Sequence, residues 1–287
     1  MNHYLSKISR LNYLLIVVFS FNASGCNEVS NYAGEKMDIK ISEQTKQSLD
    51  VIKSSRILFS HQSVGYNILS GLNMLTDEAK VELNVKNIDN GVVENKNAFA
   101  HTTGGKNEFP KTKIDSFVKN ISDLKTTFVP DIAFMKLCYI DIKPDTDVVD
   151  VFNYYKNNIK NLQRENPRTT FIHLTVPLVA ESNSLKSKIK RILGMQTWQE
   201  ASNIKRHEYN NLLAETFKNE PIFDVARIES TDMNGVQEKF SKNGKVYYNL
   251  LPQYTSDGGH LNQLGQYVLA TEMVNFLGQT LKHKITN

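Results

Sequence analysis

Strand-like and helix-like stretches alternate along this chain from Leu49 onward, and this alternation strongly limits the folds it can adopt. Short apolar runs are separated by longer stretches whose apolar residues recur at helical spacing. The predicted strands span residues 56–60, 81–88, 131–137, 169–176 and 221–225, and the predicted helices span 64–75, 113–124, 148–164, 198–217 and 261–281. Such alternation indicates a parallel sheet with helices on both faces. We therefore expect an α/β fold, a three-layer α/β/α sandwich with a mainly parallel five-stranded sheet.

Three polar residues follow predicted strands at the edge of the sheet where sites usually form. Ser63 comes after the first strand and Asp141 after the third, and His260 lies in the last loop before the closing helix. Open α/β sheets bind ligands at the carboxyl ends of their strands. We therefore expect these residues near one another.

The segment from Ser256 to Asn262 contains an aspartate three residues before a histidine. At this spacing Asp257 can accept a hydrogen bond from one imidazole nitrogen of His260 and leave the other nitrogen as a base. The alternative is ordinary turn and capping chemistry, since Asp-Gly-Gly is common in turns and Asn262 stands just before a helix.

Ser63 lies at a predicted strand-to-helix turn. Unpaired backbone N–H groups and the helix dipole favour a developing negative charge at this position. A serine hydroxyl needs a neighbouring base to act as a nucleophile, and His260 is the candidate. The alternative is that Ser63 only caps the helix, which is a common role of serine.

The order of these motifs resembles that of the SGNH/GDSL hydrolases. The segment 57–63 resembles the first block of that family, with His61 and Gln62 in place of Gly and Asp, and with Ser63 at the nucleophile position. Asp257 and His260 match the Asp-x-x-His of the last block. The resemblance covers roughly residues 50–282 and implies a flavodoxin-like fold with Ser63, His260 and Asp257 as catalytic residues.

The third block departs from the family pattern, and this concerns the oxyanion hole. Cys138 replaces the family's Gly, and Ile140 replaces its Asn. In the family the oxyanion is held by the N–H of the nucleophile, by a Gly after the second strand and by that Asn. Gly105 and Asn107 are therefore the expected donors here, and Gly91 is a rival glycine that a plain tight turn also explains.

Other polar residues near these motifs are candidate substrate contacts. His61 and Gln62 flank the nucleophile and either donate to the oxyanion or orient the substrate, with a packing role as the alternative for His61. Tyr139 either lines the pocket or packs. Lys136 lies inside an apolar strand, where its charge needs a partner such as Asp141. The seven histidines show no metal-ligand spacing, so no metal and no cofactor are expected.

The N-terminus has the pattern of an export signal. Basic residues precede an apolar run that is too short to span a membrane, and small residues then precede Cys26, as in a bacterial lipobox. We expect a signal peptide with lipobox over 1–25, lipidation of Cys26, a polar tether over 26–48 and a hydrolase-like domain over 49–287. The alternative is ordinary cleavage to a soluble periplasmic protein.

Removing this signal takes away two basic residues and no acidic one, so the formal charge falls from +4 to +2 and indicates no nucleic-acid partner. Segment 182–191, rich in serine and lysine, is expected to be a solvated basic loop, with a lid as the alternative. Trp198 is expected to pack in the core, although it could stack on a sugar.

These observations predict an exported, lipid-anchored serine esterase. Its expected partner is an acylated glycan or small ester, with an O-acetylated carbohydrate or cell-wall polymer as the leading substrate, and the membrane is expected to hold it through the N-terminal lipid anchor only. The alternative is a catalytically degenerate lipoprotein of the same fold that binds a glycan or other ligand without hydrolysis. The substitutions at His61, Gln62 and Ile140 favour that alternative, and Ser63, Asp257 and His260 oppose it.

Overall fold

The computed structural model describes residues 41–89 and 96–286, which belong to one compact unit, Asp38–Asn287. This unit contains two hydrophobic cores and all of the candidate site residues from the mature domain. The predicted signal peptide, Cys26, most of the predicted tether and Gly91 lie outside the described residues. Within the described ranges no helix is long and apolar enough to cross a membrane.

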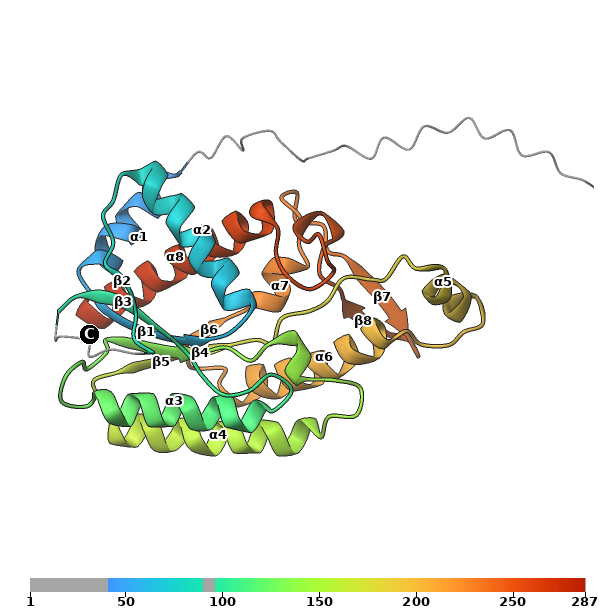
Figure 1. The fold of residues 1–287 in the computed structure, drawn as a ribbon, viewed down its shortest axis with the longest axis horizontal. Helices are drawn as coiled ribbons and strands as arrows, with labels where there is room; N and C mark the ends of the chain where they lie inside the picture. Colours follow the sequence, from blue (N-terminus) through green and yellow to red (C-terminus); the bar gives the residue numbers. More distant parts are fainter. Residues whose placement is uncertain (1–40, 90–95, 287) are drawn as a thin grey trace, which may run out of the picture. The chain divides into compact units, whose positions relative to one another are not determined.

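A parallel sheet of six strands forms the centre of the unit, in the order β2-β3-β1-β4-β5-β6 (Figure 1). The strands are β1 (Arg56–His61), β2 (Val85–Asn87), β3 (Ala98–Thr103), β4 (Ile132–Met135), β5 (Thr170–Leu174) and β6 (Ile222–Phe223). The predicted α/β class and parallel sheet are confirmed. The predicted count of five strands is wrong, because β3 was missed.

Strand β3 was missed because its sequence, Ala-Phe-Ala-His-Thr-Thr, has neither a continuous apolar run nor a strict alternation. It nevertheless lies between β2 and β1, and Phe59 of β1 pairs in register with His101 of β3. The predicted strand over 81–88 contracts to the three-residue edge strand β2. Pairing on both sides thus decides the structure of β3 more than local propensity does.

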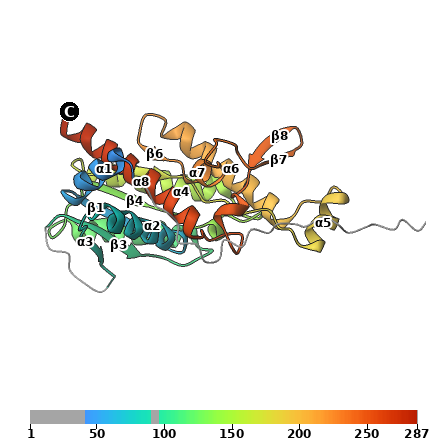
Figure 2. The same cartoon turned by 90° about the horizontal axis from the view of Figure 1, so that it is seen from above.

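Helices cover both faces of the sheet, as expected for a three-layer sandwich (Figures 1 and 2). One core joins the sheet to α1, α2, α7 and α8, and the other joins it to α3, α4 and α6. The first group comprises α1 (Glu43–Lys53), α2 (Val64–Ala79), α7 (Val225–Glu229) and α8 (Gln263–Thr286), and the second α3 (Pro110–Leu124), α4 (Val148–Glu165) and α6 (Trp198–Thr216).

Helix α1 corrects the predicted boundary between tether and domain. Ser42 caps this helix by accepting a hydrogen bond from the N–H of Thr45. Thr45 and Ser48 are buried together with Leu49, and α1 packs against α8. The polar composition of this segment concealed an amphipathic helix, so residues 43–48 belong to the domain.

Three smaller features extend the carboxyl-end region. The hairpin of β7 (Lys239–Lys242) and β8 (Lys245–Tyr248) and the short 3-10 helices η1 (Tyr139–Asp141) and η2 (Pro252–Tyr254) were not predicted. Segment 182–191, expected as a loop, forms most of α5 (Leu185–Ile192), and Ser184 caps that helix.

Candidate active site

Ser63 occupies a strained turn between β1 and α2. Its backbone has φ 50° and ψ −109°, an unusual conformation for a residue other than glycine. Its side chain caps no helix N–H, although the residue stands at the N-cap position. The Oγ atom instead lies 2.6 Å from Nε2 of His260. This geometry fits a half-buried nucleophile in contact with its base better than a helix cap.

Asp257 orients His260 through several hydrogen bonds. Its Oδ2 lies 2.6 Å from Nδ1 of His260, and its Oδ1 accepts from the backbone N–H groups of His260 (2.7 Å) and Gly259 (2.8 Å). Burial alone would raise the pKa of the Asp257 carboxyl, but these hydrogen bonds outweigh it and lower that pKa to about 2. The carboxylate is therefore ionised at neutral pH.

The structure thus brings together Ser63, His260 and Asp257, the three residues expected to be catalytic. Ser63 and His260 are 197 positions apart in sequence, yet their side chains are in direct contact. His260 bridges hydroxyl and carboxylate through its two nitrogens, the arrangement in which an imidazole can take a proton from serine while an aspartate holds its tautomer.

The loop after β3 is fixed beside Ser63 by Gln62. The Nε2 of Gln62 donates to the carbonyl oxygens of Gly104 (3.1 Å) and Gly105 (2.6 Å). Gly105 has φ +67°, and a Cβ there would lie 2.4 Å from the backbone N of Lys113, so only glycine fits. Both protons that Gln62 could offer an oxyanion are directed to these carbonyls, so its predicted donor role is wrong and its role is to position the loop.

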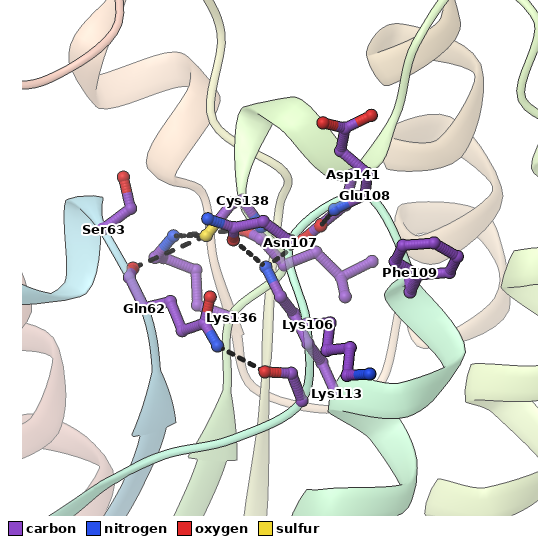
Figure 3. Close-up of polar contacts among 12 residues, drawn as sticks. Gln62, Ser63, Lys106, Asn107, Glu108, Phe109, Lys113, Lys136, Cys138 and Asp141 are labelled. Atoms are coloured by element: carbon purple, nitrogen blue, oxygen red, sulfur yellow. Dashed lines mark hydrogen bonds and ion pairs between the residues drawn. The ribbon is translucent and has the colours of Figure 1, made fainter.

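Asn107 extends from the same loop toward Ser63 and Cys138 (Figure 3). Its Oδ1 accepts from Nζ of Lys113 at 2.9 Å, which fixes the orientation of the amide and leaves its Nδ2 as a donor. Among the described residues no acceptor lies on this Nδ2 or on the backbone N–H of Ser63 or of Gly105. These are the donors expected for an oxyanion hole.

A buried ion pair locks the loop of Asn107 to the segment after β4. Lys113 Nζ and Asp141 Oδ2 lie 2.6 Å apart, and both side chains are almost fully buried. Asp141 also accepts from the backbone N–H of Cys138 (2.6 Å) and of Glu108 (2.9 Å). Asp141, named as one possible partner for Lys136, pairs with Lys113 instead.

His61 lies away from the reacting groups. Its side chain is only 2 % exposed, its Nε2 is 3.1 Å from Nδ1 of His101, and its ring packs against Phe59. Burial, followed by the charges of His101 and Lys136, lowers the pKa of His61 to about 3, so the ring is neutral. The predicted contact with substrate is wrong, and the packing alternative holds.

The buried His61 predicts acid sensitivity of the fold. Between pH 6.5 and about 3 the unfolded chain binds a proton at this residue that the folded chain does not, so the free energy of unfolding falls as the pH falls, by up to about 1.4 kcal/mol per pH unit. His101 acts in the same direction, because burial lowers its pKa too. We expect urea unfolding of His61→Gln to show a shallower pH dependence than the parent; equal slopes would contradict this account.

Tyr139 lies on the aspartate side of the site. Its ring meets the His260 ring edge-on at 5.6 Å, and a Cβ at Gly259 would come within 2.7 Å of its Cζ. Tyr139 also lines an open pocket of about 360 Å³, with Trp198 at 40 % exposure. The other lining residues are Val179, Ala180, Glu181, Ser182, Asn183, Gln199, Asp257, Gly258 and Gly259. The expectation that Trp198 packs in the core is wrong.

Two buried charged residues beneath the site, Arg206 and Glu229, were not predicted from the sequence, in contrast to Lys136. Arg206 of α6 is fully buried and donates through Nε (3.0 Å) and Nη2 (2.6 Å) to the carbonyl of Tyr139. Burial lowers the pKa of Arg206 to about 9 and raises that of Glu229 to about 8. Lys136 donates to the carbonyl of Leu137 (3.1 Å) and contacts Sγ of Cys138 (3.6 Å). These groups support the floor of the site. The only sequence signal for them was a charged residue inside a helical or apolar pattern.

Cys138 is a buried free thiol. Within the two described ranges no three His, Cys, Asp or Glu side chains gather where they could hold a metal ion. The reaction that this geometry supports needs only the serine, the imidazole, the carboxylate and the N–H donors.

Comparisons with protein-family models and with curated proteins each gave no match. Among solved structures, the chain is similar to a provisionally assigned platelet activating factor from Streptococcus pneumonia (17 % identity, TM-score 0.46, covering 82 % of this chain and 91 % of that one). It is also similar to the periplasmic domain of a Salmonella ser. Paratyphi A lipopolysaccharide acetyltransferase (14 % identity, TM-score 0.42, covering 86 % of this chain and 90 % of that one). A third similar structure is a carbohydrate esterase of family 3 from Talaromyces cellulolyticus (13 % identity, TM-score 0.41, covering 79 % of this chain and 97 % of that one). Because all three identities are below 25 % and all three TM-scores are below 0.5, we infer the function from the site alone.

Proposed function

We propose that this protein is an exported serine esterase that removes ester-linked acyl groups, chiefly O-acetyl groups, from a carbohydrate or cell-wall polymer. The observation that carries the proposal is the chain of two 2.6 Å contacts from Ser63 Oγ through His260 to Asp257. A serine, a base and an orienting carboxylate in this order make a hydroxyl nucleophilic at neutral pH.

In the first half of the reaction Ser63 Oγ forms a bond to the ester carbonyl carbon while its proton passes to Nε2 of His260. Asp257 holds the imidazole in the tautomer that accepts this proton and stabilises the imidazolium. The carbonyl oxygen becomes an oxyanion, which accepts hydrogen bonds from the N–H of Ser63, the N–H of Gly105 and Nδ2 of Asn107. The ester C–O bond then breaks, and the departing alcohol takes the proton from His260.

In the second half water releases the acyl group. His260 takes a proton from the water, the resulting hydroxide attacks the acyl carbon, and the bond to Ser63 Oγ breaks as that oxygen regains a proton from His260. The same donors hold the second oxyanion. The products are the carboxylic acid and the free hydroxyl of the substrate.

The pocket beside Asp257 supports a carbohydrate substrate. It carries hydrogen-bonding side chains, including Asn183 and Gln199, together with the half-exposed ring of Trp198. An aromatic face beside polar groups suits a sugar ring, whose C–H surface stacks while its hydroxyls form hydrogen bonds. The predicted export signal and the predicted lipid anchor at Cys26 would place such an enzyme among envelope glycans.

A binding protein without hydrolysis is the second candidate. The observation in its favour is Ile140, which stands where the resembling family has an oxyanion donor. The Nδ2 of Asn107 offers a replacement donor from another loop, and this supports hydrolysis over binding alone.

Acetate release from O-acetylated xylan and O-acetylated peptidoglycan, compared with p-nitrophenyl acetate, tests the substrate class. We expect Trp198→Ala in residues 38–287 to raise KM for the glycans about tenfold, because one stacking contact is lost. Hydrolysis of p-nitrophenyl acetate should be unchanged. Trp198→Phe, which keeps an aromatic face, is the matched control. Hydrolysis of p-nitrophenyl acetate without acetate release from either glycan would contradict the carbohydrate assignment.

A further inference from the structure

Helix α5 presents an apolar face to solvent. Leu185 is 75 % exposed, Ile192 84 % and Leu193 67 %, and Ile189 on the same face is 48 % exposed. With 3.6 residues per turn, these four positions fall within one strip along the helix. We refer to Leu185, Ile189, Ile192 and Leu193 as the apolar strip.

The polar face of α5 is the one turned toward the protein. Ser187 is buried there, and Arg191 pairs with Glu181 and donates to the carbonyl of Ser182. Nζ of Lys242 in β7 donates to the carbonyl of Gly194 at 3.2 Å just after the helix. A surface helix normally buries its apolar face, so α5 is held in the reverse orientation.

Lysines flank the apolar strip. Lys186, Lys188 and Lys190 lie on α5, and this helix contains no acidic residue. Long lysine side chains can lie along apolar surface with their ammonium groups extended toward anions. A helix that lies in the interface of an anionic bilayer has this pattern, with apolar residues in the middle and cationic residues at the margins.

The position of α5 leaves the strip accessible. Both views place the helix beyond the end of the sheet (Figures 1 and 2), and the contact of Lys242 with Gly194 brings the β7–β8 hairpin close to its end. Exposed Met195 and Trp198 continue the apolar surface after the helix, and tryptophan is favoured at the membrane interface. The pocket lined by Ser182, Asn183 and Trp198 begins at the same place.

We propose that α5 is a membrane-docking helix that inserts the apolar strip into an anionic lipid surface. The lysines argue against a second copy of the chain as the occupant, because two such faces would bring like charges together. The aliphatic side chains and their cationic margin instead match lipid tails and phosphate headgroups. Docking would hold the pocket lined by Ser182, Asn183 and Trp198 close to the membrane surface, independently of the predicted anchor at Cys26.

Vesicle binding by residues 38–287 tests this proposal. We expect the domain to sediment with vesicles of phosphatidylethanolamine and phosphatidylglycerol and to bind those of phosphatidylcholine weakly. Leu185→Ser with Ile192→Ser should weaken binding about tenfold or more, since each change removes several buried CH₂ groups. Each of Lys186→Gln, Lys188→Gln and Lys190→Gln should weaken it about fivefold at low salt. The fluorescence of Trp198, the chain's one tryptophan, should shift to shorter wavelength on docking.

Controls separate this proposal from the catalytic one. Val149→Ser, at an exposed apolar position on α4, should leave vesicle binding unchanged, and the Leu185/Ile192 variant should keep full hydrolysis of p-nitrophenyl acetate. Equal vesicle binding by the parent and that variant, or no binding by the parent, would overturn the proposal. Light scattering that shows a dimer of the parent and a monomer of the variant would also overturn it, because a second copy of the chain would then cover the apolar strip.

Discussion

Ser63→Ala is expected to lower the rate of ester hydrolysis by about 10⁴-fold or more, because no other group replaces the attacking oxygen. The hydroxyl is already 2.6 Å from the base, and the strained turn of Ser63 directs it there. His260→Ala should cost about as much, since residues that act as one unit have non-additive effects. The measurement is kcat/KM for p-nitrophenyl acetate with purified residues 38–287.

Ser182→Ala is the matched control for this experiment, since Ser182 lines the neighbouring pocket without contacting His260. We expect it to keep nearly full activity toward the small ester. The thermal unfolding midpoint of Ser63→Ala should match or exceed that of the parent, because alanine leaves the fold intact. Residual hydrolysis within tenfold of the parent would show that Ser63 is not the nucleophile.

Asn107→Ala has the second largest expected effect, a loss of about 10²- to 10³-fold in kcat with little change in KM. This is the usual cost of one oxyanion donor, and it falls on kcat because the oxyanion exists only along the reaction path. The amide of Asn107 is held by Lys113 at 2.9 Å and extends toward Ser63 (Figure 3). The measurement is steady-state kinetics with p-nitrophenyl acetate.

Lys106→Ala, one residue earlier in the same loop, is the control for loop disturbance, and we expect it to change kcat less than twofold. Asn107→Ala also removes a partner of Lys113, so its unfolding midpoint is measured beside its kinetics. A stable Asn107→Ala protein with unchanged kcat would assign the third donor elsewhere. A parent protein without hydrolysis would favour the ligand-binding alternative.

The sequence predicted the layers of this fold because hydrophobic periodicity is a local property. The helices that carry Leu72 and Phe117 have apolar residues at helical spacing, and their burial faces follow from that spacing. Strand β3 was not predictable in this way, since its pairing partners come from distant segments. The first turn of α1 was concealed for a similar reason: it is polar in composition and is buried through its contact with α8.

The same distinction holds for the site: a contact within a short segment was predictable from the sequence, and contacts set by packing between distant segments were not. Asp257 and His260 contact each other within one turn of chain, so their spacing predicted their geometry. The positions of His61 and Gln62 beside Ser63 gave no information on which way their side chains point, and both turn away from the reacting groups. The burial of Arg206 depends on how α6 packs beneath Tyr139, which no local pattern encodes.

Labelling with a fluorophosphonate probe tests the central claim most directly, because the probe reacts with an activated serine and needs no knowledge of the substrate. Residues 38–287 are treated with the probe, and the adduct is located by peptide mass spectrometry. We predict one adduct, on Ser63, that disappears in His260→Ala while the fold is retained. Absence of labelling in the folded parent protein, or an adduct on another serine, would contradict the account.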